Sequence, residues 1–186
     1  MGKAIFFDRD NTLVEDPGYL RDPEKVKLLP GVGAALRRLA EAGYKLVVVT
    51  NQNAIAKGLL AEEILGLIHG RLRDLLGEFG VGLAAIYYCP FHPEAKVAAY
   101  RRQSDERKPA PGMLLRAARE LGLDLAQSWM VGDSPRDVEA GRRAGCRTIH
   151  LVHADRPAMH PDEPSSPDFV VSTIEQAVDV ILRGGN

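Results

Sequence analysis

Hydrophobic residues recur along this chain in two alternating patterns. The first pattern is a short, almost uninterrupted apolar run, seen at residues 4–7, 45–50, 84–88, 128–132, 147–151 and 169–171. Runs of this length are typical of strands that are buried on both faces of a parallel sheet. We therefore expect six strands, of which the last and shortest lies at an edge of the sheet.

The second pattern has helical spacing and lies between the apolar runs. It covers residues 31–42, 61–79, 111–121, 135–144 and 174–182. In the first stretch Val32, Leu36 and Leu39 share one face, and Gly43 follows as a helix-ending residue. Strands that alternate with helices predict βαβ units and a parallel sheet covered on both faces. The expected fold class is α/β, a Rossmann-like three-layer sandwich with a mainly parallel sheet.

Length and composition narrow the class of protein. The chain has 186 residues, of which 45% are hydrophobic and 26% charged, which suits one globular domain over residues 1–186. A net charge of −1 gives no electrostatic reason to expect binding to nucleic acid or to a membrane surface. No apolar run approaches the roughly 18 residues of a membrane span. Two cysteines make no disulfide framework, which favours a cytoplasmic protein. We also expect a monomer. The proline-rich residues 157–167 are expected to form an exposed loop.

Polar side chains follow the ends of the predicted strands. They are Asp8 and Asp10 after the first strand, Thr50 after the second, Lys108 in the loop after the third, and Asp133 and Asp137 after the fourth. Because parallel strands direct their carboxyl ends to one edge, these groups should converge there. The clustered acids would repel each other more than one lysine can offset, and oxygen ligands suit Mg²⁺. This combination is typical of phosphoryl transfer, in which a carboxylate can be the nucleophile.

Simpler interpretations stay open at this point. Residues 8–11 could form only a turn, Thr50 could cap the following segment, and Lys108 could be a solvated loop charge. Arg9 points away from its neighbours by strand parity and could be structural. Asp137 could bind a metal through water, orient the lysine, or only favour a helix N-terminus.

The motifs nevertheless follow an order found in a known family. Asp8-x-Asp10-x-Thr12, then Thr50, Lys108 and Asp133-x-x-x-Asp137 resemble the haloacid dehalogenase superfamily of phosphatases. Further segments at residues 18–19, 50–52, 87–90 and 107–113 are similar to its branch of heptose bisphosphate and histidinol phosphate phosphatases. The spacing between the motifs leaves no room for a cap domain, so a haloacid dehalogenase-like fold without a cap is expected.

The resemblance implies a role for each matching residue. Asp8 would attack phosphorus, Asp10 would act as general acid and base, and Thr50 and Lys108 would stabilise the phosphoryl group. Mg²⁺ would be held by Asp8, by the main-chain carbonyl of Asp10 and by Asp133. The residues implied in substrate binding are Asp16, Pro17, Gly18, Tyr19, Asn51, Gln52, Asn53 and Arg107. The expected partner is a small phosphorylated metabolite, with a heptose bisphosphate first, then histidinol phosphate or another ester.

Departures from the family pattern also carry information. Relatives hold a zinc ion in the loop before Arg107, but here only Cys89 remains of four ligands. The other three positions carry Phe91, Ser104 and Glu106. Structural zinc prefers cysteine and histidine, so zinc is not expected, and the loop should instead rely on packing of Phe91 and Tyr100. Asn11 replaces a glycine but tolerates the left-handed conformation. Ser134 stands where close relatives often carry lysine.

Two proteins of other classes could share part of this pattern. A receiver-type phosphoacceptor module also gathers acids, a hydroxyl and a lysine at strand ends, but its hydroxyl and lysine follow later strands. A binding protein without catalytic activity would not need the complete set of Asp8, Asp10, Thr50, Lys108 and Asp133. The sequence therefore favours an enzyme, and specifically a phosphoric monoester hydrolase.

Overall fold

A computed structural model describes residues 1–153 and 166–184 and shows one six-stranded sheet in which all paired strands are parallel. The strand order is β3-β2-β1-β4-β5-β6. The strands are β1 (Ala4–Phe7), β2 (Lys45–Asn51), β3 (Ala85–Cys89), β4 (Trp129–Gly132), β5 (Arg147–Leu151) and β6 (Phe169–Val171). The predicted α/β class is confirmed, and β6 lies at an edge as expected.

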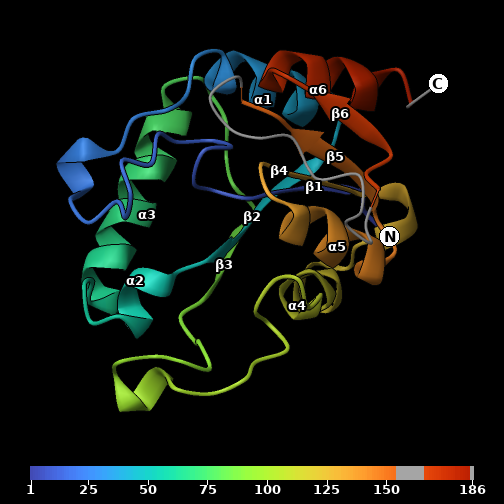
Figure 1. Cartoon of the computed structure of the whole chain (residues 1–186). Coiled ribbons are helices and arrows are strands. Elements are labelled where there is room, and N and C mark those ends of the chain that lie inside the picture. The colour runs from blue at the N-terminus through green and yellow to red at the C-terminus, as the bar shows by residue number, and fades with distance from the viewer. Residues whose placement is uncertain (154–165, 185–186) are drawn as a thin grey trace.

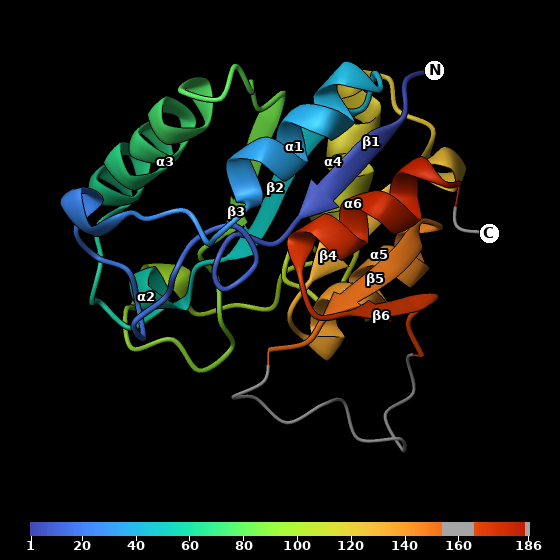
Figure 2. The same ribbon diagram turned by 90° about the horizontal axis from the view of Figure 1, so that it is seen from above.

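Helices cover both faces of the sheet (Figures 1 and 2). One face carries α1 (Val32–Glu41), α3 (Glu62–Gly77) and α6 (Ile174–Leu182), and the other carries α4 (Gly112–Leu121) and α5 (Pro135–Ala144). The predicted helices are all present, α5 and α6 with the predicted bounds and the others with ends displaced by at most two residues. The sequence pattern did not indicate the short α2 (Asn53–Ala56) or the 3-10 turns at Pro23–Lys25, Ala98–Tyr100 and Leu125–Gln127.

The two faces of the sheet build two separate hydrophobic cores. Successive strand residues point to opposite faces, so Ile5 and Phe7 pack with α1, α3 and α6, whereas Ala4 and Phe6 pack with α4 and α5. All four residues are fully buried. This explains why β1 is a continuous apolar run and not an alternating one.

The carboxyl ends of the central strands lie level with one another. Phe7 pairs with Val48 of β2 and with Val131 of β4, so the residues that follow each strand emerge at the same edge. Between β1 and α1, and between β3 and α4, the described chain holds loops with one 3-10 turn each and no inserted domain. This edge of the sheet therefore carries no cap.

Two sequence-based expectations concern regions away from the sheet. Residues 157–165 of the predicted exposed loop lie outside the described residues. Among the helices of the described part, none combines the length and the apolar character that crossing a membrane requires.

The contact between α5 and the sheet depends on a glycine. A Cβ at Gly141 would lie 2.6 Å from Met130 Cβ and 2.8 Å from Thr148 Cγ2. We predict that Gly141→Ala lowers the free energy of unfolding by about 1–3 kcal/mol, because the helix must move away from the sheet. Urea denaturation measures the change.

The matched control is Gly66→Ala in α3, where no atom lies within 4 Å of the added methyl group. It should raise the free energy of unfolding by about 0.5–1 kcal/mol, through helix propensity alone. Equal effects of the two substitutions would contradict this packing.

Candidate active site

A cavity of about 290 Å³ opens at the carboxyl edge of the sheet. Its lining includes Asp8, Asp10, Asp133 and Asp137, together with the side chain of Lys108. These five residues follow β1, β3 and β4 in the chain, as the sequence predicted. The convergence of strand ends is therefore confirmed, and the interpretation of residues 8–11 as only a turn is wrong.

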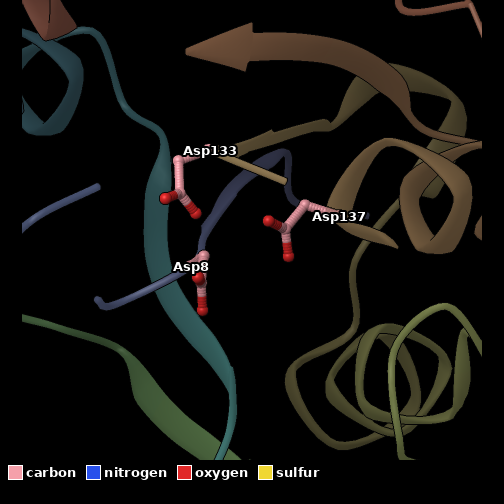
Figure 3. Close-up of side chains that lie close together, drawn as sticks. All are labelled: Asp8, Asp133 and Asp137. Carbon is pink, nitrogen blue, oxygen red and sulfur yellow. The ribbon is translucent and has the colours of Figure 1, made fainter. Parts of the chain in front are cut away.

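Three of the carboxylates form a compact cluster. One oxygen from each of Asp8, Asp133 and Asp137 lies within 4.8 Å of the others, and Figure 3 shows these side chains arriving from the ends of β1 and β4 and from α5. If ionised, the three carry three negative charges, against the single positive charge of Lys108. Hard oxygen donors with a surplus of two negative charges fit a divalent cation such as Mg²⁺.

Lys108 is buried between two of these acids. Its Nζ lies 2.8 Å from Asp8 Oδ1 and 2.6 Å from Asp137 Oδ1, and it donates to the Val49 carbonyl at 2.7 Å. Burial alone would lower the pKa of Lys108, but the charges of Asp137 and Asp8 outweigh burial and raise it. The side chain is thus a fixed ammonium group, and the interpretation as a solvated loop charge is wrong.

Asn51 holds the loop that carries this lysine. Its Nδ2 donates to the Lys108 carbonyl at 3.0 Å, and its Oδ1 accepts from the Lys108 N–H at 3.1 Å. Both ends of the amide are therefore used to connect β2 to the loop after β3. The predicted contact of Asn51 with substrate stays a prediction.

Asp137 serves two of the three roles left open by the sequence. It pairs with Lys108, and its Oδ2 accepts from the Ser134 N–H at 3.0 Å in a capping box at the start of α5. A Cβ on Gly132 would lie 2.5 Å from the Asp137 side chain. The glycine thus allows Asp137 to approach the end of β4.

The Asp10 carboxylate is not part of the acidic cluster and is instead bound by the side chains of Arg9 and Gln52. Arg9 donates from Nε to Asp10 Oδ1 at 2.8 Å and from Nη2 to Oδ2 at 2.9 Å, and Gln52 Nε2 donates to Oδ2 at 3.0 Å. Arg9 is 1% exposed, whereas the Asp10 side chain keeps 21% exposure toward the cavity. Burial raises the pKa of Asp10 above its usual range despite the adjacent guanidinium. A carboxyl with a raised pKa is suited to donate a proton.

Thr50 is buried in the floor of the same network. Its hydroxyl accepts from Gln52 Nε2 at 2.8 Å. The helix α2 that follows has Gln52 at its N-cap position and no capping side chain. The interpretation of Thr50 as a helix cap is therefore wrong.

The predicted substrate residues do not all lie in one place. Asp16, Tyr19, Asn51, Gln52 and Asn53 line the cavity, whereas Pro17 lines a neighbouring hollow. The Gly18 N–H donates to Asp16 Oδ1 at 3.0 Å, which shapes the segment between them. Arg107 lies behind Asn53 and donates to its Oδ1 at 2.6 Å. Contact of these residues with substrate stays a prediction.

Two functional candidates were missed by sequence reasoning. Arg136 lines the cavity, and His69 contacts Arg9 from α3. The sequence could have indicated His69, because this polar residue falls on the buried face of α3 between Ile68 and Leu72. Nothing in the sequence indicates Arg136 in this way, because an arginine in the first turn of a helix is ordinarily solvated.

The loop between β3 and Arg107 packs as predicted. The Phe91 and Tyr100 rings lie 6.1 Å apart, and the Arg102 guanidinium lies 3.6 Å from the Phe91 ring centre. Cys89 is fully buried beneath this loop. Asn11 has a φ of 55°, the left-handed conformation expected for it.

The strand order is that of a Rossmann-like α/β fold, with an acidic cavity at the carboxyl edge of its sheet. A model of the haloacid dehalogenase-like hydrolase family matches residues 15–145. The chain is also 41% identical over 183 residues to the D-glycero-beta-D-manno-heptose-1,7-bisphosphate 7-phosphatase of Haemophilus influenzae, with 98% of each chain covered. The phosphatase of the same name from Escherichia coli K12 is 39% identical, covering 97% of this chain and 94% of the relative. This chain belongs to the haloacid dehalogenase-like hydrolase family.

Solved structures extend the similarity. A HAD-like phosphatase from Mesorhizobium loti superposes with a TM-score of 0.83 at 32% identity, over 99% of this chain and 88% of the other. The D,D-heptose 1,7-bisphosphate phosphatase from B. bronchiseptica, solved with magnesium and phosphate, gives a TM-score of 0.79 at 29% identity. That superposition covers 98% of this chain and 99% of the other.

The buried pair of Lys108 and Asp137 yields a stability prediction. Lys108→Met should lower the free energy of unfolding by about 3–5 kcal/mol, because it leaves Asp137 buried without its counter-ion. The double variant Lys108→Met/Asp137→Asn should recover part of that loss, because the amide carries no charge. Chemical denaturation of the two single variants and the double variant gives the coupling free energy. Strictly additive losses would mean that the pair is not coupled.

Proposed function

We propose that this chain is a magnesium-dependent phosphomonoesterase that works through an aspartyl-phosphate on Asp8. Its proposed substrate is D-glycero-beta-D-manno-heptose 1,7-bisphosphate, from which it would remove the 7-phosphate. The observation that carries the proposal is the Asp8 carboxylate, which borders the cavity beside a buried lysine and within an acidic cluster. The names of relatives about 40% identical support the substrate.

The metal would be held by the carboxylates of Asp8 and Asp133 and by the main-chain carbonyl of Asp10. Bound there, Mg²⁺ would neutralise charge on the phosphate and on the crowded acids. The donor set fits this ion because it consists of oxygen atoms and carries surplus negative charge.

The protein's own groups would then perform the chemistry. An Asp8 oxygen forms a bond to phosphorus while the bond from phosphorus to the sugar oxygen breaks, and the Asp10 carboxyl gives its proton to that oxygen. Asp10, now ionised, takes a proton from the water that cleaves the phosphoenzyme. The Lys108 ammonium would stabilise the phosphoryl oxygens by its positive charge, and the Thr50 hydroxyl would stabilise them by a hydrogen bond.

Two cations favour a substrate with a second anionic group. Arg136 borders the cavity with its Nε donating to Ser134 Oγ at 2.9 Å, and Arg107 lies behind Asn53. Within residues 1–153 and 166–184, the ion pairs involve neither arginine. Burial and the charge of Arg136 lower the pKa of Arg107. Two neighbouring guanidinium groups attract a second phosphate, which heptose bisphosphate has and histidinol phosphate lacks.

We further propose that the chain acts as a monomer in the cytoplasm, with residues 1–186 as one domain. Every described strand belongs to one sheet, which supports a single folding unit. Light scattering during size-exclusion chromatography measures the oligomeric state directly.

The activity test is release of inorganic phosphate from a panel of phosphate esters, with and without Mg²⁺. We predict turnover of heptose 1,7-bisphosphate at a kcat/KM above that of histidinol phosphate, and loss of turnover when a chelator removes the metal. Asp8→Asn should lower kcat at least about 1,000-fold, because it removes the nucleophile.

The control for that variant is Asp74→Asn, which changes an exposed carboxylate on α3 outside the cavity and should leave kcat unchanged. Turnover by Asp8→Asn at the unmodified rate would refute the proposed mechanism. A preference for histidinol phosphate would refute only the substrate.

The second-phosphate interpretation predicts a selective effect of Arg136→Met. The KM for the bisphosphate should rise about 5- to 20-fold, which corresponds to about 1–2 kcal/mol of one charge-assisted hydrogen bond. The KM for 4-nitrophenyl phosphate should stay within about twofold, since that ester has no second anionic group. Steady-state kinetics on both esters make the comparison, and equal changes in KM would contradict it.

A further inference from the structure

A histidine stands among apolar residues on the buried face of α3. His69 is 9% exposed, and the same face carries the fully buried Leu65, Ile68 and Leu72. Its Nε2 lies 3.3 Å from Arg9 Nη1, and its ring lies 5.9 Å from the Tyr88 ring. His69 does not line the cavity, but Arg9 does, so the contact with Arg9 connects His69 to the cavity.

Burial and the contact with Arg9 determine the protonation state and the tautomer of the His69 imidazole. Burial, and then the positive charges of Arg9 and Arg73, lower the pKa of His69 to about 3. The ring is therefore neutral at physiological pH, with one N–H and one acceptor nitrogen. Because a guanidinium can only donate, Nε2 must be the acceptor and the proton must be on Nδ1.

Arg9 connects this acceptor to the cavity. Four of its five N–H donors have partners, namely Asp10 Oδ1, Asp10 Oδ2, Gln52 Oε1 and His69 Nε2. Asp10 and Gln52 contact the guanidinium from the side of the cavity, whereas His69 contacts it from the core. The guanidinium plane is thus anchored at both ends, and with it the orientation of the Asp10 carboxyl.

We propose that His69 is a positioning residue for the general acid, holding Arg9 so that the Asp10 carboxyl faces the leaving oxygen. The inference rests on the proposed function, in which Asp10 donates that proton. Without the acceptor on α3, one end of the buried guanidinium loses its partner and the plane can rotate. A general acid needs hydrogen-bond geometry to its target, and small misplacements cost rate.

The step involved makes this role measurable. As the Asp8 oxygen bonds to phosphorus, the bond from phosphorus to the ester oxygen breaks, and the proton of Asp10 moves to that oxygen. A sugar alkoxide is a poor leaving group and requires the proton. A 4-nitrophenolate leaves without it, so loss of positioning should affect the two esters differently.

The experiment compares kcat/KM for heptose bisphosphate and for 4-nitrophenyl phosphate, because kcat/KM reports only the steps through phosphoenzyme formation. His69→Leu should lower kcat/KM for the sugar ester about 10- to 100-fold, no more than the lower end of the roughly 10²–10⁴ that a complete general acid contributes. For the aryl ester the loss should stay below about threefold. His69→Gln keeps an acceptor oxygen, so it should restore kcat/KM for the sugar ester to within about threefold of the value for the unmodified protein.

Two further variants test whether the effect of His69 passes through the general acid. Leu72→Ala removes packing from the same face of α3. It should lower the melting temperature and change kcat/KM for both esters by the same factor. Asp10→Asn should show the same selectivity for the sugar ester as His69→Leu, in a more severe form.

The outcomes separate the role of His69 from the role of Asp10. If His69→Leu lowers kcat/KM equally for both esters, or for neither, His69 is a core residue and the inference is overturned. If Asp10→Asn shows no selectivity, the general acid of the proposed function is wrong instead. Selective loss in His69→Leu with recovery in His69→Gln supports the inference.

Discussion

The structure at the carboxyl edge of the sheet depends on one interaction, the burial of the Lys108 ammonium between Asp8 and Asp137. This ion group joins the end of β1, the loop after β3 and the first turn of α5, three segments that are distant in the chain. Buried charges are tolerated only when they are paired. The same pairing leaves the acidic cluster with surplus negative charge, which a divalent cation would balance. Stability and the proposed chemistry therefore depend on the same few atoms.

A second network separates the two acids that follow β1. Asp8 contacts Lys108, whereas Asp10 contacts Arg9 and Gln52. Two carboxylates two residues apart thus have different environments, and burial raises the pKa of Asp10. Pairs of acids in different surroundings can take different roles, one as nucleophile and one as proton donor. The haloacid dehalogenase-like fold provides the strand end, and the side chains around it distinguish the two acids.

Much of this could be predicted because it depends on local patterns. Continuous apolar runs such as residues 4–7 indicate buried parallel strands, and parallel strands bring Asp8, Thr50 and Asp133 to one edge whatever the details of packing. Side-chain contacts between distant segments could not be predicted in this way. The amide of Asn51 matches the pattern of a substrate contact, yet it bonds the main chain of Lys108. His69 interrupts an apolar helix face, but nothing in the sequence indicates that it faces Arg9.

The central claim is that the Asp8 carboxylate carries the phosphoryl group during turnover. The most direct test is to mix the protein with Mg²⁺ and substrate, quench with acid within the turnover time, and locate added phosphoryl groups by peptide mass spectrometry. We predict one phosphoryl group on the peptide that contains Asp8, at position 8, and none when Asp8 is replaced by Asn. Phosphate release with no modified peptide, or a phosphoryl group on another residue, would contradict the account.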